Sequence, residues 1–329
     1  MKKLVTFILV LCLVLGMGTV AFADEIEYKD HSEVVIIKNF TKNGDIPNTE
    51  FTFTIGKGRG ERDGEIIDAP DLTSSLIITV KGEEEKGTGT IALPKVDEDG
   101  FSGVGVYTYE ITEENSNIAG VTYDGKRILK IYVFNNEDGE GYIRVPVLLN
   151  ADEKEKSEGF ENSFNTGTLT IYKEVTGNMG DKQRKFDITV TLTAPEGRKV
   201  TAPIYVGGGT NNPHTFGEDG ELEIELNLAH GEDITISNIP YGVTYEVTET
   251  LPEDLLDYKG PVIDYSDENK VIDELDEGEE SDRVIVTNQK DISIETGINL
   301  DNAPYIAILA VAIGGLALFL IRRRMAVNL

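Results

Sequence analysis

Residues 24–296 consist largely of short runs in which apolar and polar side chains alternate. The runs are rich in Val, Ile, Thr, Tyr and Phe, and turn sequences such as Asp124-Gly125 and Asp219-Gly220 separate them. Alternation with a period of two is typical of strands that bury one face, and no long apolar pattern with the helical period is present. We therefore predict an all-β fold, and a segment of this length suits two domains better than one.

An internal repeat indicates how the two domains are related. Three short segments recur in the same order, and the spacing from lysine to glutamate is nearly the same in both copies. The repeated segments contain Lys38 and Lys173, then Glu113 and Glu249, then Asn162 and Asn288. A fixed order with matching spacing is typical of a tandem duplication. We predict two tandem immunoglobulin-like β-sandwiches, residues 24–165 and 166–292, with a boundary near Asn165-Thr166-Gly167.

All six of these polar residues are in phase with core positions. Side chains alternate between the two faces of a strand, so Lys38 shares a face with Ile36, and Lys173 shares one with Ile171. The glutamates and asparagines are likewise in phase with apolar residues two positions away. We therefore predict one buried lysine, one buried glutamate and one buried asparagine in each domain.

Burying these three residue types together predicts a specific reaction. Burial lowers the pKa of a lysine and raises that of a carboxyl group, so a proton can pass from the ammonium to the carboxylate. The neutral amine is then nucleophilic, and the protonated carboxyl can polarise the asparagine carbonyl. Attack of lysine Nζ on asparagine Cγ with loss of ammonia would form an amide cross-link, favoured by proximity. The alternative is an unreacted buried salt bridge with an asparagine hydrogen bond.

Both ends of the chain carry signals for membrane handling. Residues 1–23 combine two lysines, an apolar stretch and an Ala21-Phe22-Ala23 cleavage site, which predicts a signal peptide. Residues 303–321 form an apolar run that three arginines follow, which predicts a transmembrane helix with a cytoplasmic basic tail. The single cysteine, Cys12, lies in the predicted signal peptide, so a covalent lock in the mature domains cannot be a disulfide.

The chain is strongly acidic, with a formal net charge of −29 at pH 7. Such a surface repels phosphate backbones, so we exclude nucleic-acid partners. Acidic turns at residues 97–100 and 218–220 lack the spaced oxygen ligands of a calcium loop, and the three histidines are dispersed in polar segments. We therefore expect neither a metal site nor a cofactor.

These motifs resemble those of a known family over nearly all of residues 30–325. The segments IIKNF, TYEITEE and FENSF in the first domain, and LTIYKEVTG, TYEVTET and VTNQK in the second, are similar to the pilin isopeptide-linkage domains of Gram-positive, streptococcal-type major pilins. In that family a lysine on the first strand joins an asparagine on the last strand, and a glutamate assists. The resemblance implies cross-links Lys38–Asn162 with Glu113 and Lys173–Asn288 with Glu249.

The tail resembles a sorting signal that spans residues 293–329. In the family, a sortase cleaves between Thr and Gly and joins the Thr carboxyl to a lysine of the next subunit or to the cell wall. The matching pair here is Thr296-Gly297, with Glu295 in place of the usual proline, which leaves the sortase class open. The resemblance implies an acceptor lysine shortly before Asn162, for which we favour Lys156, with Lys154 as the alternative.

The resemblance implies a structural subunit of a covalently polymerised pilus, secreted and anchored to the cell wall after a membrane-tethered precursor stage. It is not expected to be an enzyme, apart from forming its own cross-links once. The implied partners are identical subunits, a sortase, peptidoglycan or a basal pilin, and a host surface or matrix. Two alternatives are a non-polymerising wall-anchored adhesin or ancillary pilin with the same domains, and an extracellular hydrolase that uses paired carboxylates.

Overall fold

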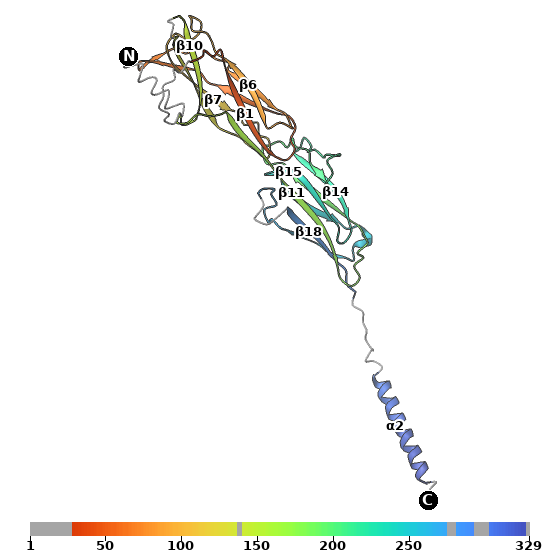
Figure 1. Ribbon diagram of the computed structural model, residues 1–329. Helices are drawn as coiled ribbons and strands as arrows, with labels where there is room; N and C mark the ends of the chain where they lie inside the picture. The colour runs from red at the N-terminus through yellow and green to blue at the C-terminus, as the bar shows by residue number, and fades with distance from the viewer. Residues whose placement is uncertain (1–27, 137–139, 275–280, 293–302, 327–329) are drawn as a thin grey trace.

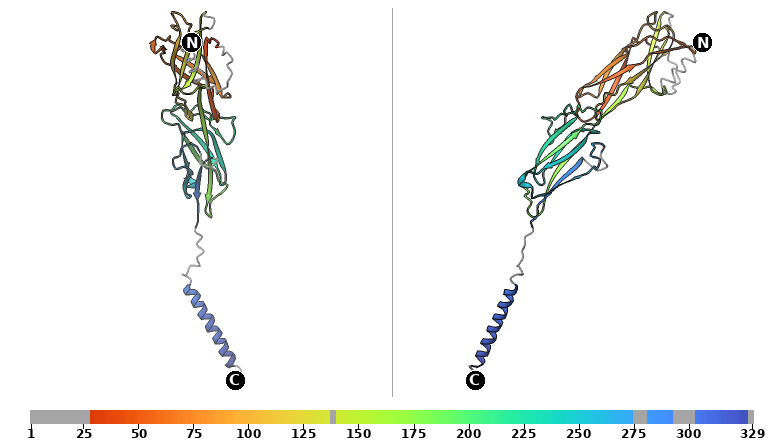
Figure 2. Two further views of the ribbon diagram at one scale, coloured as in Figure 1. Left: turned by 60° about the vertical axis from the view of Figure 1, so that its left-hand side comes forward. Right: turned by 180° about the vertical axis from the view of Figure 1, so that it is seen from behind.

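The computed structural model describes residues 28–136, 140–274, 281–292 and 303–326. Two elongated β-domains lie end to end, and helix α2 follows them in the chain (Figure 1). Views from other directions show the same end-to-end arrangement of the two domains (Figure 2). The predicted all-β fold with two tandem sandwiches is therefore confirmed, whereas the predicted signal peptide lies outside the described residues.

The first domain is a sandwich of two sheets. One sheet contains the central strand β1, which pairs in antiparallel fashion with β6 and in parallel fashion with β11, and β8 adds to the far edge of β11. Its strands are β1 (Glu33–Asn43), β6 (Lys86–Ala92), β8 (Val121–Thr122) and β11 (Phe160–Thr176). The facing sheet has the order β10-β9-β7-β2-β5, and β3 and β4 extend it beside β7. Its strands are β2 (Thr49–Ile55), β3 (Arg59–Arg62), β4 (Glu65–Ile67), β5 (Ser75–Val80), β7 (Gly105–Glu113), β9 (Lys126–Asn135) and β10 (Tyr142–Asn150).

The alternating pattern of the sequence explains the core of this domain. In β2 the residues Phe51, Phe53 and Ile55 are buried, and the threonines between them are not. The same alternation in β1 buries Ile36 and Phe40, and Lys38 lies between them on the same face, with none of its surface exposed. A charged residue therefore occupies the middle of an apolar stripe, as the phase of the strand predicts.

The second domain repeats this plan with fewer strands. Its first sheet has β11 in the centre, between β15 and β18, with β13 and β17 at the two edges. These strands are β13 (Tyr205–Val206), β15 (Asp233–Pro240), β17 (Lys259–Tyr265) and β18 (Asp282–Gln289). The facing sheet has the order β14-β12-β16, from β12 (Phe186–Thr193), β14 (Glu221–Leu228) and β16 (Thr244–Thr250), and a short 3₁₀ helix, η1 (Glu253–Leu255), follows it. A separate apolar cluster fills the space between these two sheets.

One uninterrupted strand belongs to both domains. Strand β11 is 17 residues long; its first part pairs with β1, and its second part pairs with β15 and β18. Phe164 is buried in the first core and Leu169 in the second, and the four residues between them are half-buried. The junction that the sequence predicts at residues 165–167 therefore lies inside a strand and not in a linker.

Hydrogen bonds from a buried asparagine tie the two domains together beside β11. Asn238, on β15, accepts the backbone N–H of Asp45 at 2.7 Å and donates to the carbonyl oxygens of Asp45 and Pro203 at 2.8 and 2.7 Å. A β-carbon at Gly44 would lie 2.4 Å from the Asn238 Oδ1 atom, so the close approach requires glycine there. The contact thus connects the β1–β2 loop of the first domain to the second.

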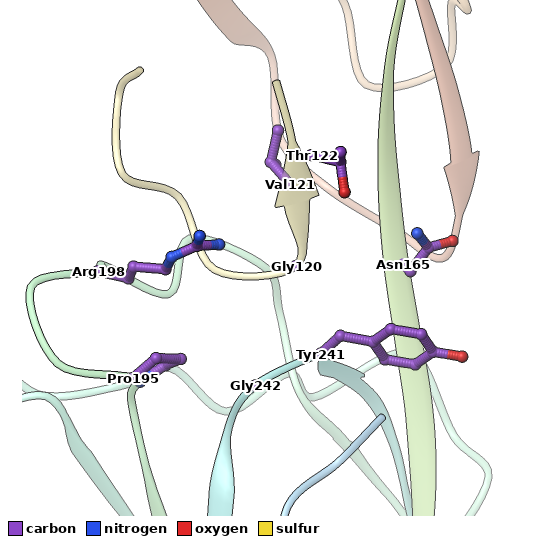
Figure 3. Close-up of a pocket in the computed structure, with 8 residues that line it drawn as sticks. All are labelled: Gly120, Val121, Thr122, Asn165, Pro195, Arg198, Tyr241 and Gly242. Carbon is purple, nitrogen blue, oxygen red and sulfur yellow. The ribbon is translucent and has the colours of Figure 1, made fainter. Parts of the chain in front are cut away.

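Loops on another side of the junction form a second contact. Ala119 donates its backbone N–H to the carbonyl oxygen of Lys199, and Lys199 donates to Asn117, both at 2.9 Å. A small hollow lies between the domains at this junction, and Figure 3 shows the residues that line it. It is lined by Gly120, Val121, Thr122, Asn165, Pro195, Arg198, Tyr241 and Gly242. The two domains are therefore joined by a strand and by contacts on more than one side of it.

Helix α2 (Ala303–Ala326) follows the two domains in the chain. Its segment Tyr305–Arg323 is 19 residues long, with a mean hydropathy of 2.3, and is long and apolar enough to cross a membrane. The predicted span at residues 303–321 matches this helix.

We predict that the Asn238→Gly variant loosens the junction without disturbing either core. Glycine removes all three hydrogen bonds but accepts the positive φ of 62° at this position without strain. Hydrogen exchange at the Asp45 amide should become about tenfold faster or more, because its buried acceptor is gone. Exchange at the Leu169 amide in β11 is the internal control and should not change. Unaltered protection at Asp45 would contradict the role given to Asn238.

Candidate functional site

Strand register brings the repeated lysine and asparagine of the first domain together. In the parallel pair β1–β11, Lys38 lies opposite Phe160, and Phe40 lies opposite Asn162. Asn162 is therefore two residues beyond the partner of Lys38, on the same face of the sheet. Glu113 comes from β7 in the facing sheet, where it pairs with Phe53 of β2. The three residues thus meet in the space between the two sheets.

The first cluster is closely packed and dry. Lys38 Nζ lies 2.9 Å from Oε1 and 3.1 Å from Oε2 of Glu113. Asn162 donates its Nδ2–H to Glu113 Oε1 at 2.7 Å. The side chains of Lys38 and Glu113 have no exposed surface, and Asn162 is 5% exposed. The Lys38 ammonium also lies 4.7 Å from the centre of the Phe51 ring, so an aromatic face shields it from water.

Burial moves both ionisable groups of this cluster toward their neutral forms. Burial lowers the pKa of Lys38 to about 8, and the charge and hydrogen bond of Glu113 only partly oppose this shift. Burial raises the pKa of Glu113, against the opposing effects of Lys38 and Asn162. Transfer of a proton from Lys38 to Glu113 is therefore easier here than in water.

The second cluster repeats the strand register and the lysine–glutamate and glutamate–asparagine contacts of the first. In the parallel pair β11–β18, Lys173 lies opposite Val286, and Val175 lies opposite Asn288, which repeats the offset of two residues. Lys173 Nζ lies 2.8 Å from Oε2 of Glu249 on the facing strand β16, and Asn288 donates to Glu249 Oε1 at 2.7 Å. Lys173 Nζ also contacts Asn288 Oδ1 directly.

The second cluster is as well enclosed as the first. Lys173 and Asn288 are fully buried, and the side chain of Glu249 has no exposed surface. The Lys173 ammonium lies 4.4 Å from the centre of the Phe186 ring. Burial lowers the pKa of Lys173, against the hydrogen bond and charge of Glu249. The six polar core positions found in the sequence thus form two matching clusters, each with one lysine, one glutamate and one asparagine.

In the first cluster the contact made by the carboxyl group differs from the one that the sequence suggested. The backbone N–H of Asp124 points at Asn162 Oδ1 at 2.8 Å, and because a backbone N–H can only donate, this end of the amide is its oxygen. Glu113 therefore contacts the amide nitrogen of Asn162 and not its carbonyl oxygen. Sequence analysis does not find Asp124, because the Asp124-Gly125 pair there indicates only a turn.

The two candidate acceptor lysines lie on the loop between β10 and β11. Both are exposed; Lys154 has an exposed side chain 3.4 Å from Asp152, and Lys156 forms an isolated bridge with Leu149. Neither contacts the buried clusters. The predicted cleavage pair, Thr296 and Gly297, lies outside the described residues. No group of three potential metal ligands occurs in the part of the chain that the structure describes.

Each of the two domains matches a family model of known proteins. Residues 34–165 match the family described as the Spy0128-like isopeptide containing domain, and residues 167–290 match a domain family of unknown function, DUF7601. A curated protein named "Pilin" from Streptococcus pyogenes serotype M1 is 28% identical over 322 residues, which cover 90% of this chain and 92% of the relative.

Solved structures agree with these matches. The major pilin from Streptococcus pyogenes is 26% identical, with a TM-score of 0.55, and the match covers 80% of this chain and all of that one. The major pilin T3.2 from Streptococcus pyogenes serotype GAS13637 is also 26% identical, with a TM-score of 0.51, over 80% of this chain and 99% of that one. The chain is thus similar over most of its length to Gram-positive backbone pilins, and residues 34–165 match the family of Spy0128-like isopeptide containing domains.

Proposed function

We propose that this chain is a structural subunit of a covalently polymerised surface pilus, and that each of its domains forms an internal amide between lysine and asparagine. The cross-links are Lys38–Asn162 and Lys173–Asn288, assisted by Glu113 and Glu249. The observation that carries the proposal is the pair of buried clusters, which share one strand register and the same contacts of glutamate with lysine and with the asparagine amide nitrogen. The sandwiches occupy residues 24–165 and 166–292, between the signal peptide (1–23) and the sorting segment (293–329).

The reaction can be written with every atom accounted for. The Lys38 ammonium gives one proton to Glu113, and the neutral Nζ attacks Asn162 Cγ to form a C–N bond. The bond from Cγ to Nδ2 then breaks, and Nδ2 leaves as ammonia after taking a proton from Glu113. Nζ gives up a second proton to the carboxylate and keeps its last as the amide hydrogen. Glu113 lies within hydrogen-bond reach of both nitrogens, so it can carry both transfers.

An unreacted salt bridge explains these clusters less well. A buried ion pair seldom stabilises a core more than apolar side chains of similar size would, because both charges lose their hydration. The asparagine is not needed for such a pair, yet in both domains its amide nitrogen lies 2.7 Å from an oxygen of the glutamate. A reaction that consumes the lysine and the asparagine together accounts for all three residues.

The comparisons and the exposed lysines support the polymer. Relatives over most of the chain are pilins, and Lys156, with Lys154 as the alternative, is accessible for attack on a sortase-bound neighbour. We propose that a sortase cuts between Thr296 and Gly297 and joins Thr296 to this lysine or, through a basal pilin, to peptidoglycan. The apolar helix α2 would hold the precursor in the membrane until then. Binding to a host surface or matrix would follow from display on the pilus.

The buried clusters are compatible with the adhesin or ancillary-pilin alternative but not with the hydrolase alternative. A wall-anchored adhesin or ancillary pilin would contain the same clusters but would not use an acceptor lysine. A hydrolase needs its carboxylates at a surface that substrate can reach, whereas the side chains of Glu113 and Glu249 are enclosed and each contacts its own lysine. Single-turnover cross-linking, and not turnover of a substrate, is the chemistry that such sealed sites permit.

Intact mass of the region 24–296 tests the cross-links. We expect the protein to be lighter than its sequence by two ammonia molecules, one for each domain. Glu113→Ala and Glu249→Ala should each restore one ammonia, because the proton carrier is lost. Glu110→Ala and Glu246→Ala are the matched controls, since these residues lie on the same strands with exposed side chains, and they should leave the mass deficit intact. A wild-type mass equal to the sequence mass would falsify the isopeptide assignment.

Cell-wall extracts test the acceptor. Lys156→Arg keeps the positive charge but removes the nucleophile, because a guanidinium group stays protonated. Detergent-resistant ladders of polymer should collapse to monomer in cells that carry this variant and persist in cells that carry Lys154→Arg. The reverse pattern would move the acceptor to Lys154, and ladders that are absent from wild-type extracts would favour the non-polymerising alternative.

Pulling single molecules from both ends tests the mechanical role. Lys38 and Asn162 lie on the first and last strands of their domain, as do Lys173 and Asn288, so each amide would carry load past the chain between them. Closing loops of this length also restricts the unfolded chain, by about 4–5 kcal/mol per bond in the entropic account of cross-links. We expect no unfolding step before covalent rupture in the wild type. Lys38→Ala and Lys173→Ala should each release one long step, and sawtooth unfolding of the unmutated protein would remove the mechanical role.

A further inference from the structure

Attack on an asparagine carbonyl places negative charge on its oxygen. As the C–N bond forms, an electron pair of the C=O bond moves onto Oδ1, and the barrier falls when a fixed donor already points at that atom. Glu113 cannot be this donor in the first domain, because its oxygens contact Lys38 Nζ and Asn162 Nδ2. The carbonyl oxygen therefore needs a different partner.

The backbone N–H of Asp124 has the required position. It lies 2.8 Å from Asn162 Oδ1 and 3.2 Å from Glu113 Oε2, at the edge of the buried cluster. Donors in known oxyanion sites lie about 2.7–3.1 Å from the oxygen that they stabilise. Asp124 belongs to the short loop between β8 and β9, and nothing in the hydrophobic pattern of that loop requires the N–H to point inward.

The side chain of Asp124 holds this N–H in place. Its carboxylate accepts the backbone N–H groups of Gly125 at 2.7 Å and Glu161 at 2.8 Å, and both of its oxygens pair with the guanidinium of Arg127. Burial alone would raise the pKa of Asp124, but these hydrogen bonds and the Arg127 charge hold it below its usual value. The carboxylate therefore stays ionised and anchored at neutral pH.

Arg127 is fixed in turn by residues just before β11 and by the first residue of that strand. Its Nε donates to Ser157 Oγ at 2.8 Å and to the carbonyl oxygen of Gly159 at 2.9 Å, and its guanidinium lies 5.1 Å from the centre of the Phe160 ring. Asn162 is two residues further along this strand. One arginine thus couples the loop that contains the donor to the strand that contains the acceptor.

We propose that the backbone N–H of Asp124 is the oxyanion donor for the first cross-link, and that the Asp124 carboxylate and Arg127 are its positioning residues. The proposal rests on the proposed Lys38–Asn162 reaction. When Nζ bonds to Cγ, Oδ1 becomes an oxyanion that faces the Asp124 N–H. When the electron pair returns to the C=O bond, the bond from Cγ to Nδ2 breaks and ammonia leaves with a proton from Glu113.

The second domain differs at this point. Among the described residues, the donor that contacts Asn288 Oδ1 is Lys173 Nζ itself and not a backbone N–H. Its cross-link therefore should not depend on Asp124. The rate at which the Lys173–Asn288 bond forms is thus an internal reference in every variant of the first domain.

The test follows both bonds in freshly synthesised protein. Cell-free translation of the region 24–296 is stopped, and samples taken over time are digested so that mass spectrometry counts the two cross-linked peptides separately. Asp124→Pro removes the N–H together with the side chain, whereas Asp124→Ala removes the side chain only. We expect the first bond to form about 100–1,000-fold more slowly with proline and about tenfold more slowly with alanine. Asp124→Asn, which retains an acceptor for one backbone N–H, should recover part of the alanine loss.

The rate of the second cross-link and the folding of the first domain are the two controls for this experiment. The Lys173–Asn288 peptide should appear at the wild-type rate in all three variants. Equal first-bond rates for the proline and alanine variants would overturn the donor role and leave Asp124 as a purely structural residue. If the proline variant does not fold, as judged by loss of proteolytic resistance in the first domain, the alanine variant decides, and a wild-type rate there overturns the proposal. Absence of both cross-linked peptides from wild-type protein would instead refute the underlying reaction.

Discussion

The rest of each domain depends on one unfavourable placement, an ammonium group enclosed between two apolar sheets. Lys38 and Lys173 have no exposed surface, and each has a carboxylate within about 3 Å and an aromatic ring beside it. Such a charge is tolerated only where its partners are fixed, so the strands that supply them must keep their register. A slip of one residue would turn the lysine outward and separate all three groups.

Much of this arrangement could be predicted from strand phase and repetition. The alternation around Ile36 and Ile171 predicts that the neighbouring lysines point inward, and the duplicated glutamates and asparagines identify their partners. The alternation also predicts the two sandwiches, because each apolar face must be covered by another sheet. The pattern does not predict which atoms of these side chains contact one another. Whether Glu113 meets the nitrogen or the oxygen of Asn162 depends on a backbone N–H, which no side-chain pattern encodes.

The same limit explains why the sequence predicts a boundary near residues 165–167 but not the strand that runs through it. Residues 165–167 include a glycine and polar side chains, which are common at a boundary, yet they continue β11 without a turn. Their pairing partners come from distant parts of the chain: Asn165 pairs with Asn43 of β1, whereas Thr166 and Gly167 pair with residues of β15. Local composition cannot reveal such partners. The residue that fastens the junction, Asn238, is likewise one of many asparagines until its neighbours are known.

The shared strand has a consequence for the order in which the chain can fold as it is synthesised from its N-terminus. The first domain is complete once β11 has emerged, since none of its strands lies later in the sequence. Pairing with β1 would then hold β11 extended, in a set register, before β15 and β18 arrive. The second domain thus starts from a strand that is already ordered, which lowers the entropy lost in bringing together its distant first and last strands. Synthesis from the N-terminus therefore suits this pair of domains, because the finished first domain presents an ordered strand to the second.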